Sequence, residues 1–342
     1  MSGLKIPFTD LPRQYATIRQ EILDAQDKVY SSGRVVDGEN TVKFEAEIAK
    51  RCNRKYAVAV NSCTQALVFA NLMTERENPC VVMPAYSFIA TLNSVLMANR
   101  YPKFIDVDNQ GLIDLNDFGQ PDANTLLFVD LYGGIPNLKK LSKLDDWLII
   151  EDAAQAFGSY YDGQPAGTFG HISCLSFAPT KNLPNYGTGG MLLTDDEHFY
   201  QVSKDFRDNG KFTRTFGSNC QMTESDCASM LVKLKYFDGW QQRRKDIADY
   251  YSSNLKNVEV PKINPSVSLN WHKYVIQSDD QSLLQLHLAN KGIETKIHYP
   301  YTFGFHSFRG AYSLTYRVLS LPIYPELSDA EVEAIVGAVN DF

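Results

Sequence analysis

Polar side chains stand at the ends of several apolar runs in this 342-residue chain, where the strands of an α/β protein would end. Asp152 follows one run, Lys181 follows another after a short turn that contains Pro179, and the polar segment 61–64 follows a third. Ligands of open α/β sheets bind outside the carboxyl ends of the strands. We therefore expect these three segments to meet in one site.

Lys181 is the candidate nucleophile. A lysine held in a tight turn beside a sheet edge is partly removed from water, which lowers the pKa of its amine and makes the amine nucleophilic, as a Schiff-base lysine requires. The alternative is an ordinary surface lysine, and the residues around Lys181 leave both interpretations open.

Asp152 and the segment 61–64 supply the next candidates. A carboxylate at this edge would meet a ligand, with Gln155 three residues further on, whereas the alternative is a helix cap, a position that aspartate favours. Segment 61–64 reads Asn-Ser-Cys-Thr and precedes a predicted helix, whose free N–H groups would bind phosphate, with the hydroxyl of Ser176 beside them. Ordinary helix capping by serine or threonine explains the same pattern.

Together these features match what pyridoxal phosphate requires of a protein. They comprise a Schiff-base lysine, a carboxylate that keeps the ring nitrogen protonated, a phosphate cradle, and the aromatic Phe88 after a strand that ends at Pro84. We predict pyridoxal 5'-phosphate, alternating with its pyridoxamine form, as the cofactor.

The elements that would position these residues read as an α/β pattern. Seven apolar runs predict strands, and the segments between several of them have helical spacing. The predicted strands are 56–60, 80–83, 103–107, 126–131, 147–150, 172–177 and 190–194, and the predicted helices of this part are 11–31, 42–52, 64–73 and 89–98. Continuous apolar strands that alternate with helices favour a mostly parallel sheet covered on both faces.

The chain changes character after about residue 233. A long helix is expected over 234–255, a short strand over 273–277, and helices over 283–291 and 329–339. We predict two domains on this basis: a large cofactor-binding α/β domain over 1–235 and a smaller C-terminal α+β domain over 236–342.

Composition argues against several classes of protein. The net charge is −7, from 33 basic and 40 acidic side chains, and the short basic run 243–245 is most simply a solvated helix face, so nucleic acid is not an expected partner. No apolar run approaches the roughly 20 residues that span a membrane, and the N-terminus lacks an apolar signal segment. The six cysteines show no zinc or disulfide pattern, so we expect a cytoplasmic protein with free thiols and no metal.

In these residues the chain resembles the DegT/StrS-type sugar aminotransferases, a family with the aspartate-aminotransferase fold, fold type I of the pyridoxal-phosphate enzymes. The resemblance runs from about Ile6 to the C-terminus, and its most specific stretch is 151–158. The other matching segments are 44–45, 61–67, 84–93, 104–108, 167–170, 176–177, 181–183, 189–191, 217–219, 298–300 and 319–322. The family fold implies a seven-stranded, mostly parallel sheet flanked by helices and a smaller C-terminal domain.

The resemblance also implies roles for single residues. Lys181 would carry the cofactor and then act as general base, and Asp152 would pair with the ring nitrogen. Gln155 would approach the ring hydroxyl, and Phe88 would stack on the ring face. The residues implied for the phosphate are Cys63 through its backbone, Thr64 and Ser176.

Two further roles follow from the resemblance or from position. Asn219 matches a residue that reaches the phosphate from the neighbouring subunit, so the resemblance implies a homodimer with active sites at the subunit interface. Tyr186, His298 and Tyr299 are candidates for the substrate side by position only, and His298 fits a structural hydrogen-bonding role as well.

The chain departs from the family pattern without losing a catalytic group. Cys63 stands where many members have glycine, and Thr188 where an acidic residue is common. His171 replaces a frequent aspartate, and Gln221 a frequent arginine. Some relatives have histidine in place of the Schiff-base lysine and catalyse dehydration, so the lysine at 181 favours transamination.

The implied reaction moves the amino group of L-glutamate to a nucleotide-linked keto-6-deoxyhexose. The favoured nucleotide is dTDP, because segment 181–187 resembles enzymes that act on dTDP-linked sugars. Amination at C4 would give a 4-amino-4,6-dideoxyhexose for surface polysaccharide such as O-antigen, and a 3-keto sugar is the alternative. A cyclitol or another ring ketone remains a rival acceptor, and a cofactor-binding regulator without turnover a rival function. A nicotinamide dehydrogenase is disfavoured because no G-x-G-x-x-G follows a strand.

Overall fold

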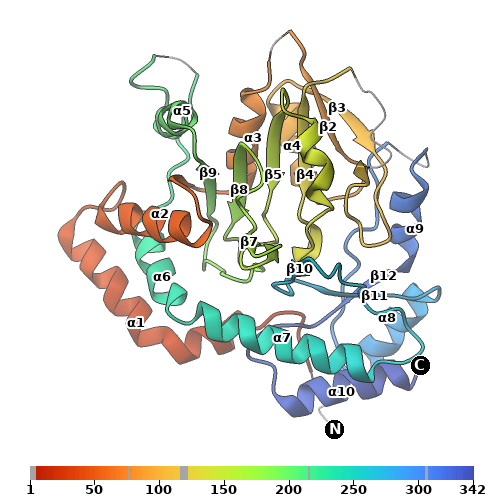
Figure 1. Ribbon diagram of the computed structural model, residues 1–342. Coiled ribbons are helices and arrows are strands. Elements are labelled where there is room, and N and C mark those ends of the chain that lie inside the picture. The colour runs from red at the N-terminus through yellow and green to blue at the C-terminus, as the bar shows by residue number, and fades with distance from the viewer. Residues whose placement is uncertain (1–4, 76, 116–121, 215, 305–306) are drawn as a thin grey trace.

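A seven-stranded sheet forms the centre of the computed structural model, which describes residues 5–75, 77–115, 122–214, 216–304 and 307–342 (Figure 1). The strand order is β1-β9-β8-β5-β4-β2-β3, and all neighbours are parallel except β9, which runs antiparallel to β1 and β8. The strands are β1 (Tyr56–Val60), β2 (Cys80–Pro84), β3 (Tyr101–Ile105), β4 (Thr125–Val129), β5 (Leu148–Asp152), β8 (Ile172–Ser176) and β9 (Gly190–Thr194). The predicted mostly parallel seven-stranded sheet is confirmed.

Helices cover both faces of this sheet because its strands are apolar on both sides. In β1, Val58 and Val60 pack into one core with Phe69, whereas Ala57 and Ala59 point to the opposite core with Phe44. The first face carries α3 (Cys63–Leu72), α4 (Ile89–Met97) and α5 (Glu197–Arg207), and the second carries α2 (Glu39–Arg51) and α6 (Glu224–Leu234). The long α1 (Leu11–Ser32) packs on α6.

The C-terminal part forms a second, smaller core around an antiparallel pair of strands, β11 (Tyr274–Gln277) and β12 (Val318–Leu321). Three helices accompany the pair: α8 (Gln281–Asn290), α9 (Arg309–Arg317) and α10 (Asp329–Asn340). Ile6 from the N-terminal segment also lies in this core and forms a parallel bridge with Ile293. The C-terminal core is therefore completed by residues from the start of the chain.

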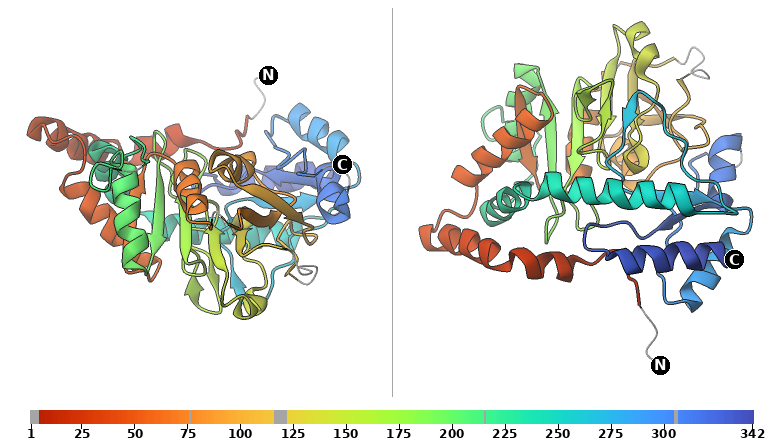
Figure 2. Two further views of the ribbon diagram at one scale, coloured as in Figure 1. Left: turned by 90° about the horizontal axis from the view of Figure 1, so that it is seen from above. Right: turned by 60° about the horizontal axis from the view of Figure 1, so that its bottom comes forward.

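Helix α7 (Phe237–Asn254) connects the two cores and is the long helix that runs along the base of the sheet in Figure 2. Its first residue, Phe237, packs into the core of the large sheet, whereas Ile247 and Tyr251 pack into the C-terminal core. The division of the chain at 235 and 236 stays a prediction. A small three-stranded sheet consists of β6 (Tyr160–Tyr161), β7 (Gln164–Pro165) and β10 (Val267–Ser268). It pairs the segment that follows β5 with the segment that precedes β11.

Most predicted elements are found within a few residues of their expected bounds, and β3 differs for a clear reason. The apolar pattern predicts a strand over 103–107, but β3 ends at Ile105. Asp106 turns away because its carboxylate accepts hydrogen bonds from the N–H groups of Gly310 and Ala311 at the start of α9, at 2.9 Å each.

Over the described residues, none of the helices combines the length and the apolar character needed to cross a membrane.

Candidate active site

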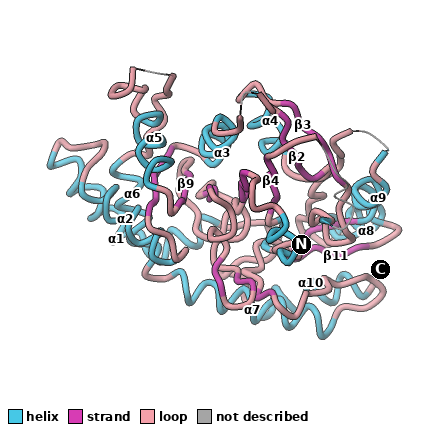
Figure 3. Tube along the Cα trace, turned by 45° about the horizontal axis from the view of Figure 1, so that its top comes forward, coloured by secondary structure: helices cyan, strands magenta, loops and turns pink. Residues whose placement is uncertain are grey.

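A cavity of about 340 Å³ lies where loops after the strands of the large sheet meet the C-terminal part of the chain. Loop segments gather between the sheet and α7 in Figure 3. Nine of the eleven residues predicted for the site line this cavity: Cys63, Thr64, Phe88, Asp152, Gln155, Ser176, Lys181, His298 and Tyr299. The volume is in the range of pockets that hold cofactors and small substrates.

Asp152 ends β5 and is 3% exposed. Its Oδ2 accepts a hydrogen bond from the hydroxyl of Thr91 at 2.8 Å, and its Oδ1 accepts one from the N–H of Ala154 at 3.2 Å. Burial raises the pKa of Asp152, and these two hydrogen bonds oppose the rise. The helix-cap alternative is wrong, because residues 153–159 form turns rather than a helix.

Lys181 lies in the turn that follows β8, where its N–H donates to the carbonyl of Ala178 at 2.9 Å. Its side chain is partly buried and lines the cavity, and burial lowers the pKa of its amine. The surface-lysine alternative does not fit this position. The structure therefore places the amine of Lys181, whose pKa is lowered, and the carboxylate of Asp152 on the wall of one cavity.

The start of α3 also lies on the wall of this cavity. Ser62 caps the helix by accepting a hydrogen bond from the N–H of Gln65 at 3.2 Å, and Cys63 and Thr64 are the first helical residues. The first N–H groups of a helix have no partner within the helix and attract phosphate. Gly190 of β9 approaches closely, since a Cβ there would lie 2.4 Å from the backbone nitrogen of Cys63.

Gln155 is held from both ends of its amide. Its Oε1 accepts a hydrogen bond from the N–H of Tyr132 at 2.9 Å, and its Nε2 donates to the hydroxyl of Tyr299 at 3.0 Å. One hydrogen of Nε2 remains for a ligand. Phe88 precedes α4, lies 5.8 Å from the ring of Tyr299 between ring centroids, and is 49% exposed at the cavity.

His298 combines a cavity position with structural hydrogen bonds. Its Nδ1 lies 2.8 Å from the hydroxyl of Ser320, and its carbonyl accepts a hydrogen bond from the hydroxyl of Tyr86 at 2.7 Å. Burial lowers the pKa of His298 to about 3, and the charges of Lys273 and Lys296 add to the effect. The imidazole is therefore neutral near pH 7, which suits a hydrogen-bonding role.

Tyr186 does not line the cavity, although it follows Lys181 closely in sequence. Its ring covers the ammonium of Lys233, whose Nζ lies 3.3 Å from the ring centroid, and it contacts Tyr15 edge-on at 5.4 Å. Its substrate role stays a prediction, and the packing shown here is structural.

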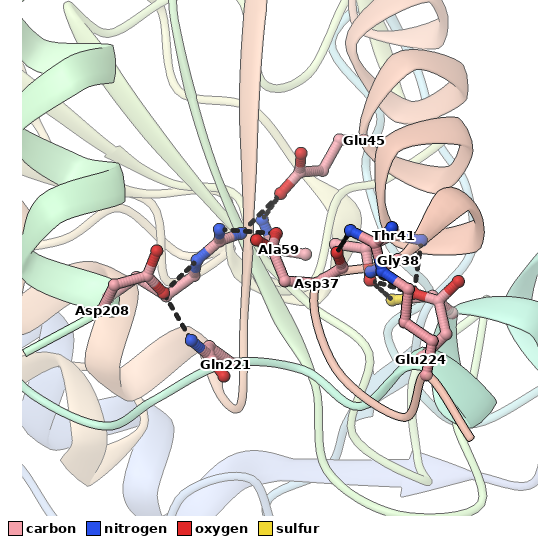
Figure 4. A network of polar contacts seen from close by, with 11 residues as sticks. Asp37, Gly38, Thr41, Glu45, Ala59, Asp208, Gln221 and Glu224 are labelled. Atoms are coloured by element: carbon pink, nitrogen blue, oxygen red, sulfur yellow. Dashed lines mark hydrogen bonds and ion pairs between the residues drawn. The ribbon is translucent and has the colours of Figure 1, made fainter.

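Asn219 is exposed and also lies outside the cavity of its own chain. The segment that carries it is fixed by a polar network (Figure 4). Gln221 donates to Asp208 at 2.5 Å, and Arg207, which is 2% exposed, pairs with Glu45 at 2.9 Å. In the same network, the carboxylate of Glu224 accepts hydrogen bonds from the N–H groups of Gly38, Asn40 and Thr41. The segment is thus held against the start of α2 with Asn219 facing outward.

Several residues of the cavity were not predicted. Thr91, the donor to Asp152, lies within the matching segment 84–93 but has no signal of its own. Phe8, His272, Lys273 and Lys296 come from distant parts of the chain and also line the cavity. No local motif marks these four residues.

The residues present fit pyridoxal phosphate. The first N–H groups of α3 and the hydroxyls of Thr64 and Ser176 would hold the phosphate, and the carboxylate of Asp152 would hold a proton at the ring nitrogen. The cofactor would supply an electron sink, and Lys181 would supply the amine that binds it and the base that moves protons. Together with the sheet topology, these residues define a fold type I pyridoxal-phosphate enzyme.

Comparison with known proteins gives the family. The model of the DegT/DnrJ/EryC1/StrS aminotransferase family matches residues 16–340, so the chain belongs to this family. It is a pyridoxal-phosphate-dependent sugar aminotransferase.

Three relatives illustrate the match. The chain is 30% identical to the erythromycin biosynthesis sensory transduction protein EryC1 of Saccharopolyspora erythraea, over 98% of this chain and 99% of the relative. It is 30% identical to the dTDP-3-amino-3,4,6-trideoxy-alpha-D-glucose transaminase of Streptomyces venezuelae, over 99% and 96%. Among solved structures, S. venezuelae DesV in complex with a ketimine intermediate superposes with a TM-score of 0.94 and 30% identity, over 98% of each chain.

Proposed function

We propose that this protein transfers the amino group of L-glutamate to a keto sugar linked to a nucleoside diphosphate. The observation that carries the proposal is the meeting of Lys181, Asp152 and the start of α3 on one cavity. In the overall exchange, glutamate leaves as 2-oxoglutarate and the sugar carbonyl becomes a carbon that bears the amine. The two substrates exchange an amino group for a carbonyl oxygen, so no external oxidant or reductant is needed.

The residues of the cavity would have different roles in this reaction. Burial favours the neutral amine of Lys181, which would act as the base that takes the proton from the amine-bearing carbon of the donor. Asp152 would keep the ring nitrogen protonated, and the hydroxyl of Thr91 orients its carboxylate. Gln155, fixed by Tyr132 and Tyr299, is placed to donate to the ring hydroxyl.

For the acceptor we propose a dTDP-linked 4-keto-6-deoxyhexose, which would become a 4-amino-4,6-dideoxyhexose for surface polysaccharide such as O-antigen. The resemblance of segment 181–187 to enzymes of dTDP-linked sugars supports the nucleotide. A 3-keto sugar is the second candidate, because the relative from Streptomyces venezuelae is named a transaminase for a 3-amino sugar.

We also infer a homodimer that acts in the cytoplasm and has active sites at the subunit interface. Asn219 is exposed and does not line the cavity of its own chain, as expected of a residue that serves a neighbouring site. Large apolar side chains are exposed near it, with Phe212 at 83% and Phe216 at 73%. Sedimentation of the cofactor-loaded protein tests the assembly: a dimer is expected, and a monomer that retains full activity would contradict the inference.

The function is tested with a panel of acceptors. The purified protein is incubated with pyridoxal phosphate, isotope-labelled L-glutamate and, in separate reactions, a dTDP-linked 4-keto sugar, its 3-keto isomer and a cyclitol ketone. Mass spectrometry of the products shows which acceptor receives the labelled nitrogen. Label in the 4-keto reaction supports the proposal, and label only in the 3-keto or cyclitol reaction replaces it. If no acceptor is labelled and glutamate leaves the cofactor unchanged, a regulatory role gains support.

A further inference from the structure

Lys273 is a buried amine on the cavity wall without an anionic partner. The residue is 8% exposed and stands just before β11. Over the described ranges, no carboxylate lies within ion-pair distance of its ammonium, and the ammonium donates no hydrogen bond to the protein. The ammonium group lies over the ring of Phe8, whose centroid is 4.7 Å from Nζ. A ring face attracts a cation but does not neutralise it.

The surroundings of Lys273 are strongly positive. Burial lowers the pKa of its amine well below the ordinary value, and the charges of Lys181, Arg244 and Lys296 lower it further. Among the described residues that line the cavity, Asp152 is the only acidic one, and the ring nitrogen of the cofactor would occupy it. A buried charge is stable only when paired. The described lining therefore offers Lys273 no carboxylate of its own, and an anionic ligand bound beside it would restore the ammonium form.

The position of Lys273 is fixed relative to the reacting lysine. Asn182, which follows Lys181, donates to the carbonyl of Asn270 at 2.6 Å, and its Oδ1 lies 3.2 Å from Nδ1 of His272. The side chain of Asn270 in turn donates to the carbonyl of Gln155 at 2.9 Å. The segment 270–273 is thus tied both to the turn of Lys181 and to the loop after Asp152.

We propose that Lys273 binds the α-carboxylate of the amino-acid donor. The assignment rests on the proposed function, in which the donor is L-glutamate. It follows from the place of Lys273: an anion bound to it would lie in the cavity that Lys181 also lines, where the donor nitrogen is exchanged. In an amino acid, the carboxylate is one bond from the carbon that bears this nitrogen. In a nucleotide sugar, the ring separates the diphosphate from C3 and C4, so the diphosphate lies farther from the exchange.

Lys296 provides a matched control. It also faces Phe8, with Nζ 5.1 Å from the ring centroid, and it also lines the cavity. However, its side chain is 47% exposed and lies 3.7 Å from the carboxylate of Glu294. It already has solvent and a partner, so its removal should affect donor binding much less than the removal of Lys273.

The test separates the two halves of the reaction. Four proteins are loaded with pyridoxal phosphate: wild type, Lys273→Met, Lys273→Arg and Lys296→Met. Each is titrated with L-glutamate and, separately, with the amino sugar product, while the near-visible absorption is followed. For Lys273→Met we expect the half-saturating concentration of L-glutamate to rise about tenfold to a hundredfold, as for the loss of a hydrogen bond to a charged group. The amino sugar titration should change less than about threefold. Lys273→Arg should recover most of the glutamate affinity, and Lys296→Met should resemble wild type.

A second readout does not need the cofactor. In cofactor-free protein, 2-oxoglutarate should raise the unfolding temperature of wild type and Lys296→Met but not of Lys273→Met, because a ligand stabilises the state that binds it. The proposal is overturned if Lys273→Met weakens only the binding of the amino sugar, or if it leaves both titrations unchanged. It is also overturned if the affinities for L-glutamate and for the amino sugar fall equally and Lys273→Arg restores neither affinity. If the wild-type spectrum does not respond to L-glutamate, the proposed function fails, and the 2-oxoglutarate experiment still decides whether Lys273 binds a carboxylate.

Discussion

Replacing Asp152 with asparagine tests the proposed role of the buried carboxylate of the site. The carboxylate is 3% exposed and is oriented by the hydroxyl of Thr91 at 2.8 Å. Asparagine has nearly the same shape and can still accept that hydrogen bond, so the fold should be kept. The substitution removes the negative charge that would face the ring nitrogen. A neutral amide would not keep that nitrogen protonated.

The magnitude follows from exchanging a charged acceptor for a neutral one. A hydrogen bond to a charged group contributes about 1.5–3 kcal/mol, and a neutral one about 0.5–1.5 kcal/mol. The difference of about 1–2 kcal/mol corresponds to roughly fivefold to thirtyfold weaker cofactor binding. The reaction with L-glutamate should slow by at least this factor, because the ring loses its proton and with it the electron sink.

The assay is a titration of cofactor-free protein with pyridoxal phosphate, followed by single-turnover reaction with L-glutamate. Thr91→Val is the control, since it removes only the hydrogen bond to Asp152 and keeps the charge. That variant should bind the cofactor within about threefold of wild type. If Asp152→Asn binds and reacts within about twofold of wild type, the carboxylate does not serve the ring nitrogen and the reading of the site is refuted.

Three further predictions concern the frame around the site. Gly190→Ala should weaken cofactor binding about tenfold or more in a titration, because its Cβ would lie 2.4 Å from the backbone of Ser62 and Cys63; Gly187→Ala, whose Cβ would meet only side-chain atoms at 3.6 and 3.8 Å, should bind normally. Glu224→Gln should lower the free energy of unfolding by roughly 2–3 kcal/mol at pH 7. Burial alone would raise the pKa of Glu224, but hydrogen bonds from Thr41 and Asn40 lower it, so the wild-type advantage should fade as pH falls through this lowered pKa in urea denaturation. Burial lowers the pKa of Lys233 from an ordinary value of 10.5 to about 7. Between these two pH values the unfolded chain binds more protons than the folded protein, so the free energy of unfolding should rise with pH across this window. Lys233→Met should lack this rise, whereas Lys235→Met, at an exposed position, should keep it; equal pH profiles for wild type and Lys233→Met would contradict the assignment.

The sequence was most informative where a functional residue is adjacent to a strong local pattern. Asp152 and Lys181 each stand at the end of a short apolar run, and the order of strands and helices brings those ends to one edge of the sheet. The start of α3 was found for the same reason, because a capping serine followed by an apolar helix is a local signal.

Contacts between distant segments left no such signal. Phe8, Lys273 and Lys296 meet at the cavity only because the N-terminal segment packs on the C-terminal core, through the bridge between Ile6 and Ile293. Proximity in sequence also misleads: Tyr186 is five residues from Lys181, yet its ring packs on Lys233 rather than in the cavity. Both cases are decided by tertiary packing, which periodicity and motif spacing do not record.

The near-visible absorption of the purified protein tests the central claim most directly. With pyridoxal phosphate added, wild type should show the band of a cofactor bound covalently to Lys181, and L-glutamate should convert this band to that of the pyridoxamine form. Lys181→Ala should not form the covalent band. A wild-type protein that shows no such band, or a Lys181→Ala variant that shows the same band, would contradict the assignment of this lysine and of the site built around it.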